Sequence, residues 1–143
     1  MLQSIADQTP NGHMFDLDEP HTLDAAPGAY ILCLQILQPI EVEQNRFNGA
    51  RLKPGLYLYC GSAKGPGGLA ARLKRHLRAK KKPHWHIDQL TIPASDMAAI
   101  AVPGGEECEL VDALLSTGEY STALEGFGSS DCNKCRSHLL TPC

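Results

Sequence analysis

GLYLYCGSAKGPGGLAARLKRHL, residues 55–77, decides the fold of this chain. Its first nine residues alternate, so that Tyr57 and Tyr59 point to one side and their neighbours point to the other, as in a strand. The loop GSAKGPGG, which overlaps the end of that strand, holds four glycines and a proline, and after it leucines recur at every fourth position from Leu69 to Leu77. That spacing is typical of an amphipathic helix, which we expect to begin near Gly68.

The segments on either side predict more strands and a second helix. GAYILCLQIL, which starts at Gly28, is rich in strand-forming residues and predicts a buried strand. Weaker strands are expected over residues 40–43 and 98–102, and alternating residues predict another over 84–92. Apolar spacing over residues 110–115 predicts a helix with acidic residues in its first turn. We therefore expect an α/β fold of the α+β kind, a small antiparallel or mixed sheet flanked by helices.

One domain is expected, because 143 residues suit a single core. Residues 1–27 are polar and acidic and predict an extension that packs loosely or crosses the surface, whereas residues 28–143 form the domain and end in a tail with Cys and His. No apolar stretch approaches the roughly 20 residues that span a bilayer, so no membrane association is expected. Six cysteines without a secretory signal indicate the cytoplasm.

The charges are unevenly distributed along the chain. The net charge is 13 − 16 = −3, which by itself argues against a nucleic-acid partner. Residues 1–45, however, hold seven acids and no Lys or Arg, and residues 46–82 hold eleven bases and no acid. A basic segment of this kind indicates a polyanionic partner, because each phosphate contact releases counterions and adds affinity. The alternative is a solvated face that pairs with acids elsewhere in the fold.

Two tyrosines and a basic helix carry the side chains that suit catalysis. If the strands at Gly28 and Gly55 pair, Tyr30 and Tyr59 stand on one face beside the glycine-rich loop. Tyrosines also suit strands for packing alone, so this placement leaves a structural role open. Arg72 and His76 are four residues apart and lie one above the other on the helix, which offers a guanidinium for a phosphate beside a titratable imidazole.

In chain order these features resemble the GIY-YIG nuclease superfamily. The first signature triplet corresponds to GAY from Gly28 and the second to YCG from Tyr59, so that Ala29 and Cys60 stand where the family has isoleucine. The blocks GSAKGPGGLAARLKRH, HWHIDQL, the Glu-Cys start of the later helix and GFGSSDC are similar to the Uri-type branch of that superfamily. The resemblance covers roughly residues 28–140.

The resemblance implies a metal-dependent endonuclease or phosphodiesterase. By this likeness Tyr59 or Tyr30 deprotonates or orients the attacking water, Arg72 steadies the charge of the scissile phosphate, and His76 assists at the nucleophile or leaving group. The carboxylate that holds Mg²⁺ or Mn²⁺ is Glu107, with Glu109 or Glu106 as alternatives. Since a phenol has a reference pKa of about 10, we expect Arg72 and the metal to lower the pKa of the tyrosine base.

Four basic residues on the loop and helix are expected to contact the backbone of DNA or RNA without reading bases. They are Lys64, Lys74, Arg75 and Arg78. A rival interpretation keeps the fold without catalysis, as a nucleic-acid-binding module of a DNA repair or RNA processing assembly. A homodimer or a partner protein is plausible in either case, because one small domain has little area for gripping a duplex.

A second set of polar residues suggests a metal site of another kind. Cys132, Cys135 and His138 follow a Cys-x-x-Cys-x-x-His pattern that suits Zn²⁺, with a fourth ligand from Cys108, Cys143, His84 or His86. One pair of cysteines is only half of the usual signature, and buried cysteines are common in cores, so the zinc interpretation competes with a packing role. His84, His86 and Asp88 either line the substrate cleft or form the wet face of a strand.

Overall fold

The computed structural model describes residues 5–7, 9, 11–16, 18, 22–42, 50–78, 81–82, 87–127 and 136–143. Six strands form one sheet in the order β1-β6-β2-β5-β8-β7, and β3 and β4 form a separate pair. Every strand pairing within these residues is antiparallel. The expected α+β fold, a mainly antiparallel sheet flanked by helices, is confirmed.

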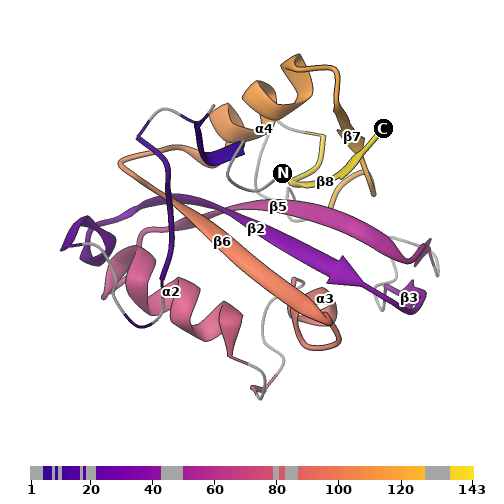
Figure 1. Cartoon of the computed structure of the whole chain (residues 1–143), viewed down its shortest axis with the longest axis horizontal. Helices are drawn as coiled ribbons and strands as arrows, with labels where there is room; N and C mark the ends of the chain where they lie inside the picture. The colour runs from indigo at the N-terminus through magenta and orange to yellow at the C-terminus, as the bar shows by residue number, and fades with distance from the viewer. Residues whose placement is uncertain are drawn as a thin grey trace.

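The elements follow one another along the chain in the order that Figure 1 labels. They are β1 (His13–Met14), the 3₁₀ helix η1 (Thr22–Ala25), β2 (Gly28–Ile36), β3 (Ile40–Glu41), β4 (Arg51–Leu52), β5 (Gly55–Ala63), α2 (Gly68–Leu77), α3 (Asp88–Thr91), β6 (Asp96–Pro103), α4 (Glu107–Ser116), β7 (Tyr120–Thr122) and β8 (Leu139–Pro142).

Helices cover both faces of the sheet. Helices α2 and α3 lie on one face and α4 lies on the other, as Figure 1 shows. The alternation of β5 assigns its side chains to these two layers: Tyr57 packs with the α2 layer, and Leu58 and Cys60 pack with the α4 layer. The strand and helix expected over residues 55–77 are therefore present as predicted.

The N-terminal residues are integrated into the domain rather than loosely attached. Strand β1 pairs with β6 at the sheet edge, and Phe15 is buried in the α2-side core. The side chain of His13 bonds the buried carboxylate of Asp24 at 2.8 Å. The expectation of a loose extension was wrong for these residues, because a few apolar side chains among the acids are enough to fix the segment on the core.

The segment near residue 88 also differs from the expectation. The alternating pattern predicted a strand over 84–92, but Asp88–Thr91 form the helix α3; residues 84 and 86 lie outside the described part of the chain. Ile87 and Leu90 are three apart and both enter the core, a spacing that suits one helical turn as well as a short alternation. The short strands β7 and β8 were not expected.

Within the described residues, none of the helices combines the length and the apolar character that crossing a membrane requires.

Candidate active site

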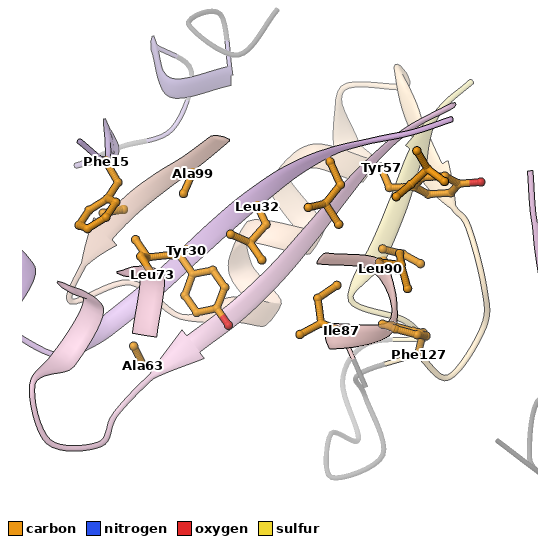
Figure 2. Packing of buried hydrophobic residues seen from close by; sticks show 14 of the residues in the cluster. Phe15, Tyr30, Leu32, Tyr57, Ala63, Leu73, Ile87, Leu90, Ala99 and Phe127 are labelled. Carbon is orange, nitrogen blue, oxygen red and sulfur yellow. The ribbon is translucent and has the colours of Figure 1, made fainter. Parts of the chain in front are cut away.

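Strands β2 and β5 bring the two tyrosines together. In their antiparallel register Tyr30 lies opposite Gly61, and Tyr59 lies opposite Leu32, so both rings stand on the α2 side. Their ring centroids are 6.4 Å apart. Figure 2 shows the Tyr30 ring in the row of buried side chains on this face, beside Leu73. The predicted convergence of the two phenols is present.

Glycine is required opposite Tyr30. A Cβ at Gly61 would lie 2.4 Å from the Cζ and hydroxyl oxygen of Tyr30, far inside the contact distance of real atoms. The ring of Tyr30 therefore lies directly over the backbone of β5. The last glycine of the signature triplet thus makes room for the first tyrosine.

The glycine-rich loop fixes where helix α2 begins. Gly68 has a φ of +59°, and a Cβ there would lie 2.3 Å from the carbonyl oxygen of Ala26. The N–H of Leu69 donates to that same oxygen at 3.1 Å. This contact docks the start of α2 on the segment after η1 and sets the height of Arg72 and His76 above the sheet.

Helix α2 delivers both of its predicted side chains to the tyrosines. The Nε2 atom of His76 is 2.8 Å from the hydroxyl oxygen of Tyr30, and the two ring centroids are 5.3 Å apart. Arg72 donates to the carbonyl oxygen of Ser62 at 2.8 Å and also hydrogen-bonds the Tyr30 side chain. Because the Tyr30 oxygen accepts from Arg72, its own proton is available to Nε2 of His76.

Glu107 approaches the same group from the other helix layer. It is the first residue of α4, and its carboxylate is partly exposed. Its negative charge raises the pKa of both Tyr30 and Tyr59, as expected for a carboxylate near both phenols. Glu109, one alternative, is exposed, and Glu106 precedes the helix. The placement favours Glu107 as the carboxylate of this site.

Burial dominates the ionisation of the site. Desolvation raises the pKa of Tyr30 and Tyr59 well above that of a free phenol, and Arg72 offsets only part of this rise. Arg72 thus acts on the tyrosine pKa in the expected direction, but burial outweighs it, and the expected effect of the metal stays a prediction. Desolvation, helped by the positive charge of Lys81, lowers the pKa of His76 to about 3. Both phenols are therefore protonated and His76 is neutral near pH 7.

The four predicted phosphate contacts do not behave alike. Lys64, Lys74 and Arg78 are exposed. Arg75 instead donates through Nη1 and Nη2 to the two carboxylate oxygens of Asp88, each at 2.9 Å. Asp88 is fully buried, and this hydrogen bond raises the pKa of Arg75. Arg75 thus holds α2 to α3, and its guanidinium is committed to a buried acid rather than left for a phosphate.

A hollow of about 180 Å³ lies next to Arg72. It is lined by Ala63, Gly65, Pro66, Gly68, Ala71, Arg72 and Arg75. Small residues from the loop leave this space, and Arg72 supplies the positive charge at its border, since the charge of Arg75 is paired with Asp88. An anion of the size of a phosphate group matches this combination of space and charge.

A family model described as "Domain of unknown function DUF123" matches residues 29–142, from the second residue of β2 to the end of β8. The chain belongs to this family. No curated protein and no solved structure matches it. All of the site residues named above lie within the DUF123 domain. The description of the family assigns no activity, so the resemblance to GIY-YIG nucleases stays a prediction.

Sequence reasoning missed three residues that support the DUF123 site. Asp88 was assigned to a strand face but anchors Arg75. Lys81 donates to the carbonyl oxygen of His76 at 2.5 Å, at the end of α2. The ring of Phe127 meets that of Tyr59 edge to face, with centroids 6.2 Å apart. The signal that pointed to the Arg75 pair was the position of Asp88, the first acid after the basic segment of residues 46–82.

The expected zinc ligands are only partly described. Cys132 and Cys135 lie outside the described residues, as do His84 and His86, whereas His138 is buried immediately before β8. Among the residues that the structure describes, no group of three or more His, Cys, Asp or Glu side chains is arranged to hold a metal ion.

Proposed function

We propose that this DUF123 domain is a metal-dependent endonuclease that hydrolyses phosphodiester bonds in DNA or RNA. The observation that carries the proposal is the convergence of Tyr30, Arg72 and His76 beside Tyr59, within reach of the charge of Glu107. Four side chains from β2, β5 and α2 lie side by side on one face of the sheet, and the carboxylate of Glu107 at the start of α4 is near enough for its charge to act on both phenols. A group that served packing alone would not need a guanidinium, an imidazole and a carboxylate around buried phenols.

Arg72 is the residue that would contact the scissile phosphate. Its guanidinium borders the hollow in front of the loop, where the small side chains admit an anion. Bonds to Ser62 and Tyr30 hold its orientation before substrate arrives. A planar guanidinium fixed in this way stabilises the charge that develops on phosphate oxygens without reorganising during the reaction.

The phenols would act as hydrogen-bonding groups rather than as a preformed phenolate. Because burial raises the pKa of both, each retains its proton in the protein alone. The bond to the neutral Nε2 of His76 fixes the direction of the Tyr30 hydroxyl. Tyr59 and Tyr30 would thus hold and orient the water that attacks the phosphate.

One carboxylate suits a hydrated magnesium or manganese ion. Mg²⁺ keeps several waters and is commonly bound through one or two carboxylates together with substrate phosphates. Glu107, which is partly exposed and whose charge acts on both phenols, fits that requirement without a cage of protein ligands. When bound, the ion would polarise the phosphate and stabilise the leaving oxygen.

The basic surface would hold the nucleic acid on either side of the cut. Lys64, Lys74 and Arg78 are exposed on the loop and helix that carry Arg72. Such contacts position a backbone and carry no sequence information. The six cysteines suit a reducing compartment, so we place the activity in the cytoplasm. A homodimer or a partner protein would extend the small contact area.

A non-catalytic nucleic-acid-binding module is the second candidate. The raised pKa of both phenols favours it, because it removes a ready base. The two candidates share the basic surface and differ only in turnover. Binding without cleavage would therefore assign the second function.

The test is a cleavage panel of labelled single-stranded, duplex and branched DNA and RNA, with Mg²⁺, Mn²⁺ or a chelator. We expect cleavage that needs the cation and that Arg72→Ala and Glu107→Gln reduce by roughly 100-fold or more. Glu109→Gln is the matched control, since it removes an exposed carboxylate from the same helical turn. Equal loss in both glutamate variants, or unchanged turnover in Arg72→Ala, would discard the mechanism.

A further inference from the structure

Three side chains form a buried row behind the proposed active site. The Sγ atom of Cys108 is 3.8 Å from Nε2 of His138. On the opposite side of the same ring, Nδ1 is 3.8 Å from Oε2 of Glu107. The N–H of Cys60 donates to the backbone oxygen of His138 at 3.0 Å, which holds the start of β8 against β5. The row is therefore anchored to the sheet and to the first turn of α4.

One ring nitrogen of His138 lacks a hydrogen-bond partner among the residues that the structure describes. The side chain is 2% exposed, and within the described residues Nδ1 has no hydrogen-bond partner. Leaving a buried polar atom unpaired costs about 1–3 kcal/mol, so such an atom calls for a partner. The carboxylate of Glu107 faces it and is less than one ångström too far to bond.

The distance between sulfur and nitrogen matches two ligands of one ion. Tetrahedral zinc binds a thiolate at about 2.3 Å and an imidazole nitrogen at about 2.0–2.1 Å, which places the two ligand atoms about 3.6 Å apart. The atoms of Cys108 and His138 are 3.8 Å apart. A weak bond between the thiol and the imidazole also fits this distance, so the surroundings of the pair must decide between the two.

The surroundings favour metal binding over that weak bond. Cys108 lies in the first turn of α4, where the helix dipole favours a thiolate. A histidine that binds a metal through one nitrogen commonly donates the other N–H to a carboxylate, which fixes the ring and raises its basicity. Glu107 occupies the place of that carboxylate.

We propose that Sγ of Cys108 and Nε2 of His138 are two ligands of a single Zn²⁺-type ion, and that Glu107 positions the His138 ring. On binding, the thiol of Cys108 loses its proton to solvent. The ion is distinct from the hydrated cation of the proposed nuclease, because sulfur and imidazole select a softer metal than magnesium. The proposal stands whether or not the domain cuts nucleic acid.

Metal titration of the full chain tests the proposal. We expect one Zn²⁺ per chain, and Co²⁺ in its place should give the intense tetrahedral spectrum with a thiolate-to-metal charge-transfer band. Cys108→Ser and His138→Gln should remove most of the binding, and Glu107→Gln should weaken it by roughly 10–100-fold. Cys143→Ser, which changes an exposed thiol at the C-terminus, should leave affinity unchanged.

Three results would overturn the proposal. The first is a wild-type chain that takes up neither Zn²⁺ nor Co²⁺, and the second is a Co²⁺ spectrum without thiolate charge transfer. The third is unchanged affinity in Cys108→Ser. If Cys108→Ser fails to fold, the Co²⁺ spectrum of the wild type and the metal affinity of Glu107→Gln still test the proposal, because neither measurement uses the serine variant. None of these measurements uses cleavage, so the zinc site and the nuclease can fail separately.

Discussion

The hydroxyl of Tyr30 connects the sheet to helix α2. It reaches across the backbone of Gly61, meets Nε2 of His76 and accepts a bond from Arg72. Since all of these atoms are buried or half-buried, the contacts are stronger than they would be in water, and losing one leaves its partner unsatisfied. Single substitutions that remove one of these hydrogen-bonding groups should therefore change the chemistry of the site.

Tyr30→Phe should separate the role of this hydroxyl from that of the ring. We expect a loss of roughly 1–3 kcal/mol in the free energy of unfolding, because His76 loses its buried partner. Under the proposed function, cleavage should fall by roughly 100-fold or more, the scale of a general acid–base contribution. Urea denaturation and initial cleavage rates measure the two effects.

Tyr57→Phe is the matched control for that variant. Tyr57 is on β5, and its side chain lies on the same face of the sheet as that of Tyr30. Its hydroxyl donates a hydrogen bond to the carbonyl oxygen of Lys53. Its loss should cost about 0.5–1.5 kcal/mol and leave cleavage intact. If Tyr30→Phe cleaves at the rate of the wild type, the hydroxyl of Tyr30 takes no part in the reaction.

Gly61→Ala should act on the site through Tyr30. The added Cβ would lie 2.4 Å from the Tyr30 hydroxyl, so the ring must move away from His76. Overpacking of this kind costs about 1–3 kcal/mol of stability. In Gly65→Ala the new Cβ meets nothing within 4 Å, and we expect a change within about 0.5 kcal/mol. Equal melting curves for the two variants would contradict the close contact.

At the residue scale, the sequence predicted the members of the site better than their ionisation. Tyr30, Tyr59, Arg72 and His76 follow from strand alternation and helix spacing, both of which are local. The pKa of a phenol depends on how many atoms surround it, which is a property of the whole core. For the same reason Arg75 was expected to contact phosphate, since its partner Asp88 is 13 positions away on another helix.

The C-terminal end of α2 is fixed at two points, and both hold His76. Lys81 donates to the backbone oxygens of Arg75 and His76, and the guanidinium of Arg75 bonds Asp88 on α3. Cations near the last carbonyl groups also suit the negative end of the helix dipole. The helix thus holds the imidazole in a buried place where it stays neutral.

That neutral imidazole should make stability depend on pH. Its pKa falls from an ordinary 6.5 to about 3 in the folded chain, so between these values the unfolded chain binds a proton that the folded chain does not. The free energy of unfolding should therefore fall as pH drops from about 6.5 toward 3, by at most about 1.4 kcal/mol per pH unit from this group. Urea denaturation across that range measures the slope.

His76→Gln isolates this contribution, because the carboxylates that also titrate in that range are common to both proteins. The wild type should lose more stability than the variant between about pH 6.5 and pH 4.5. The same slope in both proteins would mean that His76 is protonated in the folded state.

Elements that carry a long regular pattern could be predicted, and short ones could not. Strands β2 and β5 and helices α2 and α4 each span at least nine residues, long enough for alternation or a four-residue period to repeat. Helix α3 has four residues, and β7 and β8 have three and four. Over so few positions a strand and a helical turn give the same pattern, and contacts with parts of the chain that are distant in sequence decide between them.

Seen whole, the molecule places its basic loop and helix at one end of the sheet. Helix α2 and the loop before it lie at one end, and β3, which pairs with β4, lies at the other, as Figure 1 shows. Lys64 and Lys74 are exposed at the first end, and Arg51 and Lys53 are exposed at the second. These two pairs of exposed cations therefore lie at opposite ends of the sheet, and the first pair is on the loop and helix that carry Arg72.

Removing the first pair should change how salt affects nucleic-acid binding. Each phosphate contact in a duplex contributes about 0.9 to the slope of log affinity against log salt concentration, since its formation releases counterions. The double variant Lys64→Gln, Lys74→Gln should make that slope shallower by about 2 and weaken binding to unrelated sequences alike. The matched variant Arg51→Gln, Lys53→Gln has the same net charge and should keep the wild-type slope. Fluorescence anisotropy with one duplex at several salt concentrations gives both slopes, and identical slopes in the two variants would mean that nucleic acid does not bind over the α2 end of the sheet.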